Sequence, residues 1–244
     1  MSILLHGDCL EEMKGLDDNS VDLIFCDLPY GQTSCKWDCP IDLDLFWLEV
    51  MRIKKSNTPI FFTTTTKFGV SLINSAPKKC HFRYDIVWVK SAAAGFLSAK
   101  KMPMRKHEMV YVFYEKLPFY DLSSHKHKFL KEGKEELDEK YKNKGGLYSK
   151  VSRNGLLKTE PHYDPPLPNS MLEIKSTRGK HSTEKPVALM EWVLKYYSKE
   201  GDTILDPTMG SGSTGIACKN MNRNFIGIEK DPEIYEGAVN RIEG

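Results

Sequence analysis

The sequence has few of the features that mark membrane, secreted or zinc-binding proteins. No apolar run reaches the roughly 20 residues of a membrane-spanning helix. Residues 1–5 lack the basic flank and the cleavage site of a secretory signal. The six cysteines are scattered, and no two of them form the Cys-x-x-Cys pair of a structural zinc site. We therefore expect a cytoplasmic protein with reduced thiols and no metal.

The sequence also lacks a strong excess of either charge. Its 35 Lys and Arg residues nearly balance 33 Asp and Glu residues, which gives a formal net charge of +2. This balance neither requires nor excludes a polyanionic partner. A length of 244 residues suits one large domain, or a core with one inserted region. Local motifs must therefore indicate the function.

Short apolar runs alternate with amphipathic segments in the first part of the chain, as in a βαβ opening. We predict a helix after Asp8, a helix over residues 41–55, and strands over residues 3–5, 21–26, 59–63, 84–89 and 109–114. Lys, Glu, Gly, Asn and Pro dominate an irregular insertion at residues 116–180. Order then returns in a helix opened by Pro186, and the final predicted elements are a strand at 203–205, a helix at 213–221, a strand at 225–228 and a helix at 232–242.

A glycine-rich loop lies between a predicted strand and a predicted helix near the end of the chain. It runs Asp-Pro-Thr-Met-Gly-Ser-Gly-Ser-Thr-Gly over residues 206–215, and Glu229 ends the next strand. Glycines let the backbone approach a ligand, the helix N-terminus offers unpaired amides, and a carboxylate at the second strand tip accepts ribose hydroxyls. The loop therefore predicts a nucleotide-like ligand.

The same glycines fit the dinucleotide fingerprint, so an NAD-dependent oxidoreductase is an alternative. Two features count against NAD: Asp206-Pro207 precedes the glycines, and few strands can follow them before the chain ends. Strands from the N-terminal half must therefore complete the sheet. We predict an α/β protein with a permuted, doubly wound, mostly parallel Rossmann-like sheet.

A second motif, Asp27-Leu28-Pro29-Tyr30, directly follows a predicted strand and so lies at the carboxyl edge of the sheet. Methylation of a base amino group requires acceptors for its N–H groups, because the nitrogen lone pair is delocalised into the ring. Asp27 and the carbonyl of Leu28 can be those acceptors, and Tyr30 can stack on a base that has left the duplex. An ordinary strand end with Tyr30 in the core also fits these residues.

These two motifs, together with His-Ser-Thr-Glu-Lys-Pro at residues 181–186, resemble the DNA amino-methyltransferases. Their order is similar to that of the β class, and the resemblance covers nearly the whole chain. It implies a permuted methyltransferase fold that uses S-adenosylmethionine. Residues 1–115 would form the catalytic half, residues 116–180 a target-recognition insertion, and residues 181–244 the cofactor-binding half.

The resemblance also implies roles for individual residues. Catalytic roles fall to Asp27, Leu28, Pro29 and Tyr30. Cofactor-binding roles fall to Asp8, Cys9, Asp27, Thr183, Glu184, Lys185, Asp206, Pro207, Thr208, Gly210, Ser211, Gly212, Ser213, Thr214, Glu229 and Lys230. Three residues depart from the family pattern, because Leu28 and Ser182 replace prolines and Thr208 replaces a phenylalanine. None of these changes removes a catalytic side chain.

A basic run with one nearby acid predicts contact with DNA phosphates. The residues expected to bind DNA are Lys90, Lys100, Lys101, Arg105, Lys106 and His107. Small residues at 91–95 predict a mobile loop over the active site. The mixed charges of residues 131–142 favour a solvated face instead. The expected partner is double-stranded DNA, and a homodimer is compatible with the family.

The resulting hypothesis is methyl transfer to adenine N6 of a flipped base. The choice of adenine follows from the resemblance, because Asp at the first tetrapeptide position is commoner in N6-adenine enzymes and Ser in N4-cytosine enzymes. An N4-cytosine methyltransferase is therefore the nearest alternative. More distant alternatives are a methyltransferase for RNA or a protein amide, an NAD-dependent oxidoreductase, and a DNA-binding module without catalytic activity.

Overall fold

The computed structural model describes residues 1–31, 40–128, 162–176 and 184–244. The chain forms two compact units, one of residues 1–121 with 169–244 and one of residues 122–168. The described part of the smaller unit holds an antiparallel strand pair, β6 (Lys126–His127) and β7 (Tyr163–Asp164). Next to this pair, the His125 ring donates a hydrogen bond from Nδ1 to the Pro165 carbonyl, across 2.9 Å.

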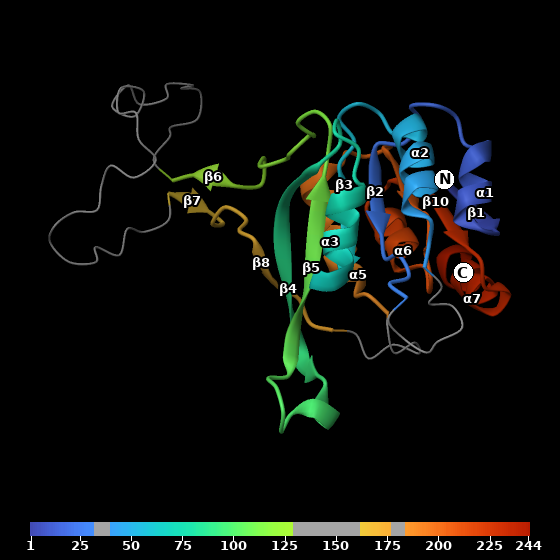
Figure 1. The fold of residues 1–244 in the computed structure, drawn as a ribbon. Helices are drawn as coiled ribbons and strands as arrows, with labels where there is room; N and C mark the ends of the chain where they lie inside the picture. The colour runs from blue at the N-terminus through green and yellow to red at the C-terminus, as the bar shows by residue number, and fades with distance from the viewer. Residues whose placement is uncertain (32–39, 129–161, 177–183) are drawn as a thin grey trace, which may run out of the picture. The chain divides into compact units, whose positions relative to one another are not determined.

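The larger unit is built on one sheet of eight strands (Figure 1). The strands lie in the order β1 (Ser2–His6), β10 (Asn224–Glu229), β9 (Thr203–Asp206), β2 (Leu23–Cys26), β3 (Ile60–Thr64), β5 (Arg105–Phe113), β4 (Phe82–Ala94) and β8 (Met171–Glu173). The C-terminal strands β9 and β10 are thus inserted between β1 and β2. All neighbours pair in parallel except β5, which is antiparallel to β3 and β4. The permuted, mostly parallel sheet predicted from the sequence is confirmed.

Helices cover both faces of this sheet (Figure 1). One face carries α1 (Cys9–Glu12), the 3-10 turn Met13–Gly15, α2 (Leu43–Ile53) and α3 (Thr66–Ser75). The other face carries α5 (Val187–Tyr197), α6 (Ser213–Asn220) and α7 (Pro232–Glu243). The alternation of a strand accounts for both layers. On β3, Phe62 packs against Trp47 of α2 with ring centroids 5.6 Å apart, and Phe61 meets Tyr197 of α5 at 5.0 Å.

Short polar side chains fix where several helices begin. The Asp42 carboxylate accepts the N–H groups of Asp44 and Leu45 at the start of α2. Thr65 caps α3, a helix that the sequence analysis did not predict. Asp231 caps α7, with Pro232 at the first helical position. These caps satisfy amides that have no partner within the helix.

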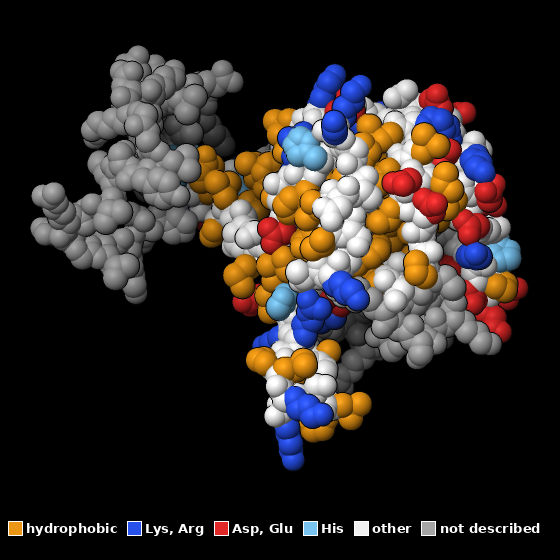
Figure 2. Space-filling model, viewed as in Figure 1, with side chains coloured by type: hydrophobic (Ala, Val, Ile, Leu, Met, Phe, Trp, Pro, Cys, Tyr) orange, Lys and Arg blue, Asp and Glu red, His pale blue; other side chains and the backbone are white. Residues whose placement is uncertain are grey.

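Strands β4 and β5 continue past the edge of the sheet as a two-stranded ribbon, which we call the arm (residues 91–106; Figure 1). Residues 91–94 belong to β4, and Ala94 pairs with Arg105. The loop expected at residues 91–95 is wrong for residues 91–94, which extend β4 with a shift of register against β5 between Val89 and Ala94; the mobility of this segment stays a prediction. Phe96 and Leu97 at the arm's end are 82% and 100% exposed, and Figure 2 shows hydrophobic and basic side chains together there.

Residues expected to form the irregular insertion also contribute to the main sheet. Strand β8 pairs in parallel with β4, and Val87 N–H donates to the Ser170 carbonyl at 2.7 Å. Trp88 lies buried between these segments and donates from Nε1 to the Ile174 carbonyl at 2.8 Å.

Among the described helices, none is long and apolar enough to span a membrane.

Candidate active site

The tips of β2 and β9 meet at the carboxyl edge of the sheet. The two strands pair in parallel, with Leu23 beside Ile204 and Ile24 beside Leu205. Just beyond them, the Thr208 hydroxyl donates a hydrogen bond to the Asp27 carbonyl across 3.2 Å. The strand-end tetrapeptide and the glycine-rich loop, 181 positions apart in the chain, therefore lie side by side.

A cavity of about 700 Å³ opens between these tips. Most residues predicted to bind the cofactor line it: Asp8, Cys9, Asp27, Glu184, Lys185, Asp206, Pro207, Thr208, Gly210, Ser211, Ser213, Thr214, Glu229 and Lys230. Of the predicted catalytic residues, Asp27 and Pro29 line it. Its size is typical of a small-molecule site.

Other predicted site residues lie outside the cavity lining. Leu28 is 2% exposed and packs in the core, although its backbone remains at the strand tip. Gly212 supports the loop from behind, with φ at +79° and Ile242 where a Cβ would lie. Tyr30 is half-buried, with its ring centroid 5.1 Å from that of Phe68. Thr183 lies outside the described residues, as do His181, Ser182, Cys35 and Cys39.

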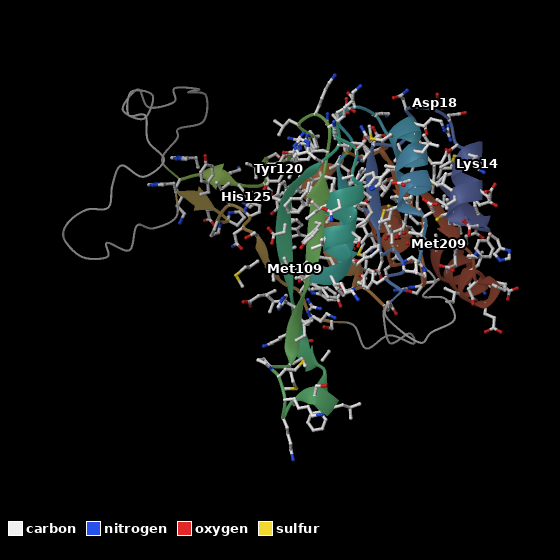
Figure 3. All side chains as sticks on the ribbon, in the orientation of Figure 1. Lys14, Asp18, Met109, Tyr120, His125 and Met209 are labelled. Carbon is white, nitrogen blue, oxygen red and sulfur yellow. The ribbon has the colours of Figure 1, made fainter. Side chains whose placement is uncertain are left out.

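The sequence analysis missed several residues of the cavity wall. These are Gly7, Leu10, Phe25, Pro40, Ile41, Asp42, Met190, Met209, Asp231, Pro232 and Ile234. Met209 could have been predicted, because it lies within the glycine-rich motif, and Figure 3 labels it near α7. The apolar members have no sequence signal of their own, because they match ordinary core positions of helices and strands.

Asp27 is held by side chains from three parts of the chain. Its Oδ1 accepts a hydrogen bond from the Tyr30 hydroxyl at 2.9 Å and another from the Thr63 hydroxyl of β3. Its Oδ2 accepts one from the Lys185 ammonium at 2.5 Å. Burial and the Asp27 charge raise the pKa of the Tyr30 phenol, so this hydroxyl stays a neutral donor. A carboxylate at the cavity wall is thus fixed in orientation.

Carboxylates at the β1 and β10 tips form the far end of the cavity. Glu229 Oε2 accepts the Gly210 N–H at 3.0 Å, and Glu229 Oε1 accepts the Asp231 N–H at 2.9 Å. Asp8 caps α1 through the Leu10 N–H and bonds the Lys230 ammonium at 3.0 Å. These bonds fix both carboxylates and leave acceptor positions for hydroxyl groups of a ligand.

Asp206 begins the glycine-rich loop and is 4% exposed. Its carboxylate accepts hydrogen bonds from the Thr214 hydroxyl at 2.6 Å and the Thr208 N–H at 3.2 Å. Burial outweighs these two bonds and raises the pKa of Asp206 to about 7. The group is therefore poised to lose its proton when a cation enters the cavity.

Glu184 and Lys185 lie next to each other in sequence but face different partners. The Glu184 carboxylate forms an ion pair with Arg241 of α7 at 2.7 Å, and Arg241 also donates to the Ser211 carbonyl at 3.0 Å. The sequence analysis missed Arg241, which connects α7 to the glycine-rich loop. Lys185 instead contacts Asp27.

The residues expected to bind DNA divide into two groups. Lys100, Lys101, Arg105 and Lys106 are exposed on the arm, and His107 is exposed at its base. Lys90 is half-buried, pairs with Glu108 and lies 5.1 Å from the Trp88 ring centroid. Glu108 was the one acid near the basic run, and this pairing gives it a local role.

The buried thiols and the acids give no sign of a metal centre. Within the described ranges, no three His, Cys, Asp or Glu side chains come together as a metal site would need. Burial raises the pKa of the Cys9 thiol to about 12, so it lines the cavity as a neutral group.

The proteins whose sequences resemble this chain include several DNA methyltransferases. The chain is 27% identical to the type II methyltransferase M.HinfI of Haemophilus influenzae, over 99% of this chain and 68% of that protein. It is 25% identical to M.HpaI of Haemophilus parainfluenzae, over 98% of this chain and 74% of that protein. A shorter match to M2.DpnII of Streptococcus pneumoniae is 44% identical over 29% of this chain and 26% of that protein.

Two solved structures share the fold. The M1.HpyAVI–SAM complex is 22% identical with a TM-score of 0.64, covering 99% of this chain and 100% of that one. The cytosine-N4-specific PvuII DNA methyltransferase is 15% identical with a TM-score of 0.68, covering 98% and 86%. The model of the DNA methylase family N6_N4_Mtase matches residues 21–240. The chain therefore belongs to the N6/N4 DNA methylase family, whose methyl donor is S-adenosylmethionine, as its motifs implied.

Proposed function

We propose that this protein transfers a methyl group from S-adenosylmethionine to N6 of an adenine flipped out of double-stranded DNA. The observation that carries the proposal is the fixed carboxylate of Asp27 in the wall that the glycine-rich loop shares. An acceptor for amino N–H groups thus lies next to a cavity that suits a nucleotide-like ligand. Direct transfer needs such proximity and no covalent enzyme intermediate.

The glycine-rich loop and the β10 tip would hold the donor. Glu229 would accept the ribose hydroxyls of the cofactor, and Asp8 and Lys230 would lie near the adenine ring of the cofactor. The sulfonium of S-adenosylmethionine supplies an electrophilic methyl group. The polar wall of Asp206 and Thr214 suits the positive charges of the cofactor.

The tetrapeptide would hold the base. Asp27 and the Leu28 carbonyl accept the two amino N–H groups, which turns the nitrogen lone pair out of the ring plane toward the methyl group. As the N–C bond forms, the bond from the methyl carbon to the sulfonium sulfur breaks and S-adenosylhomocysteine leaves. The positively charged nitrogen then loses one of its protons to water. Tyr30 offers an aromatic face for the flipped base, while Phe68 packs against its ring. The Tyr30 hydroxyl also fixes Asp27, so this residue would serve both base and carboxylate.

We propose adenine rather than cytosine as the target base, because Asp27 occupies the position at which N4-cytosine enzymes more often have Ser. The PvuII enzyme, a cytosine-N4-specific protein, has the same fold, so the fold is compatible with either base. The exposed arm cations Lys100, Lys101, Arg105 and Lys106 would contact phosphates on either side of the target.

Product analysis tests the proposal directly. Duplex DNA is incubated with the protein and S-adenosylmethionine, digested to nucleosides and analysed by mass spectrometry. N6-methyl-2′-deoxyadenosine is expected; N4-methyl-2′-deoxycytidine would select the alternative base. Absence of any methylated nucleoside, with DNA still bound, would indicate a binding module. RNA and protein substrates, and calorimetry with NAD, test the more distant alternatives.

An Asp27 variant tests the site itself. Asp27→Ala should abolish methylation and leave most of the S-adenosylmethionine affinity, because the amino acceptor is lost and the glycine-rich loop is kept. Substantial turnover by this variant would contradict the role of Asp27. Modified-base sequencing of DNA from cells that express the protein would also reveal the target sequence.

A further inference from the structure

The hydrogen bonds of Asp27 leave little freedom to its carboxylate. Oδ1 accepts from the Thr63 hydroxyl and lies 2.9 Å from the Tyr30 hydroxyl, which shares its one proton between Oδ1 and the Thr63 carbonyl, also at 2.9 Å. Oδ2 accepts from Lys185. A carboxylate offers about four lone-pair positions, two on each oxygen. Both positions of Oδ1 thus face hydroxyl groups, and about one position of Oδ2 remains beside Lys185. The direction in which this last position points is therefore set by Lys185.

Lys185 is well placed for that task. Its side chain is 12% exposed, and it lies directly before Pro186, the N-cap of α5. Besides Asp27, its ammonium faces Glu108 Oε2 at 3.7 Å. Glu108 in turn pairs with Lys90 through its other oxygen. Four side chains of alternating charge thus run from the base of the arm to the catalytic carboxylate, and their formal charges sum to zero.

The charge state of Lys185 follows from these neighbours. Burial alone lowers the pKa of a lysine, but Asp27 and Glu108 outweigh burial and raise the pKa of Lys185 above its ordinary value. The ammonium therefore stays protonated throughout the physiological range. Glu108 Oε2 is buried and accepts no hydrogen bond within the described part of the chain, so it holds Lys185 by charge.

We propose that Lys185 is a positioning residue for Asp27 rather than the cofactor ligand that the family resemblance implied. This inference rests on the proposed methyl transfer to a base amino group. The Lys185 ammonium fixes the rotation of the Asp27 carboxylate, so that the remaining lone pair of Oδ2 faces the cavity. Glu108 prevents Lys185 from turning toward the cavity, which would place an extra cation beside the sulfonium and the amine nitrogen that becomes positive during transfer.

A merely structural ion pair predicts something different. Removal of one partner of a buried ion pair leaves an uncompensated charge and lowers stability. The Asp27 and Glu108 side chains are 30% and 22% exposed, so water can solvate them and removal of the Lys185 charge need not unfold the protein. A cofactor ligand, in turn, would weaken S-adenosylmethionine binding when it is removed. A positioning role predicts a lower rate with unchanged cofactor affinity.

The test compares Lys185→Met and Lys185→Arg with the wild-type protein. Lys185→Met should lower the single-turnover methylation rate by roughly a hundredfold, because misplacement of a reacting group by about 1 Å costs that much. Its dissociation constant for S-adenosylmethionine should not change in calorimetry. Lys185→Arg keeps the charge and should recover part of the rate. Glu108→Gln should slow the reaction in the same direction, by a smaller factor.

A double-mutant cycle identifies the partner. In an Asp27→Asn background, followed over long incubations, Lys185→Met should cause little further decrease in rate, because Lys185 acts through the carboxylate. Lys54→Met is the matched control: Lys54 is also buried and paired, with Glu115 at 3.0 Å, but lies away from the cavity wall. This control should keep the wild-type rate.

Three outcomes would overturn the inference. They are full activity of Lys185→Met, a weakening of S-adenosylmethionine binding in proportion to the decrease in rate, and an equal effect of Lys185→Met in the wild-type and Asp27→Asn backgrounds. If Lys185→Met is too unstable to assay, Glu108→Gln and Lys185→Arg still carry the comparison. Failure of the proposed function differs from all of these, because then the wild-type protein itself yields no methylated nucleoside.

Discussion

The Thr208 hydroxyl donates to the Asp27 carbonyl across 3.2 Å and so joins the glycine-rich loop to the strand-end tetrapeptide. Thr208→Val removes the donor and keeps the shape of the side chain. We expect a decrease of roughly 0.5–1.5 kcal/mol in the free energy of unfolding, together with a lower methylation rate. Thermal unfolding and single-turnover assays measure both.

Thr208→Ser is the control for this bond, because it keeps the hydroxyl. It should resemble the wild-type protein in rate. Equal rates for the Val and Ser variants would show that the link between the two tips does not contribute to the reaction.

The raised pKa of Asp206 predicts that the protein releases protons when the cofactor binds. With a pKa of about 7, raised by burial from the ordinary value of 3.8, about half of the molecules are protonated at neutral pH. The positive charges of S-adenosylmethionine favour the carboxylate, so binding should release on the order of half a proton at pH 7. Calorimetry in two buffers with different ionisation enthalpies measures this number. Asp206→Asn should release none, and an equal release by that variant would assign the proton to another group.

The same group affects stability with a defined sign. Between its ordinary value of 3.8 and about 7, Asp206 binds more protons in the folded protein than in the unfolded chain. Its contribution to the free energy of unfolding therefore falls as pH rises through this window. Asp206→Asn should remove this part of the pH dependence in denaturant titrations of the protein without cofactor. A variant whose stability follows the wild-type curve from pH 4 to 7 would contradict the assignment.

Two glycines of the cofactor loop should respond differently to alanine. At Gly215 a Cβ would lie 2.5 Å from Ile242 and 2.8 Å from Phe225, whereas Gly212 also has φ at +79°. Each substitution should cost roughly 1–3 kcal/mol of stability. Ile242→Val should partly rescue Gly215→Ala and should rescue Gly212→Ala less, because backbone strain remains there.

Gly95 is the reference for strain alone, with φ at +91° and open space around its Cα. Gly95→Ala should lower the melting temperature less than either loop substitution. If Ile242→Val rescued both loop variants equally, crowding rather than backbone strain would explain Gly212.

The arm predicts a salt dependence of DNA binding. Lys100→Gln, Lys101→Gln and Lys106→Gln should each weaken binding and reduce the slope of log affinity against log salt by about 0.9 for each phosphate that is no longer neutralised. Lys90→Gln should change the slope less, because Lys90 is paired with Glu108. Lys14→Gln in the 3-10 turn that follows α1 is a control, since Lys14 is exposed and paired with Glu11. Slopes that respond to Lys14 as much as to the arm would reject the arm as a DNA contact.

Much of the fold follows from local sequence. Residues 23–26 and 60–64 are buried throughout, so the short, mainly apolar runs in the sequence located the central strands. The few residues after the glycine-rich loop required a permuted sheet, and the strand order has that form. Helix α3 was missed because Thr66, Val70 and Ile73 lower the helical signal, while tertiary packing of Phe68 and Leu72 stabilises it.

The cavity was easier to predict than its internal contacts. Glycines, prolines and acids at strand ends indicate a ligand edge, and most of those residues line the cavity. The direction of side chains was harder to predict. The family pattern grouped Lys185 with Glu184 as cofactor-binding residues, but their side chains contact different partners, Asp27 and Arg241. The arm was missed because its alanines and serine have weak strand propensity.

The antiparallel direction of β5 determines where this strand enters the sheet. Because β5 runs against β3, with Thr64 beside Met109, it starts at the edge where the parallel strands end. The segment that leaves the arm thus passes the reaction centre on its way into the core, and Glu108 is the residue at that crossing. Insertions of two residues in each strand of the ribbon would lengthen its reach while each side chain kept its face. If the arm binds DNA as proposed, the span that it contacts can therefore vary without any change in the chemistry.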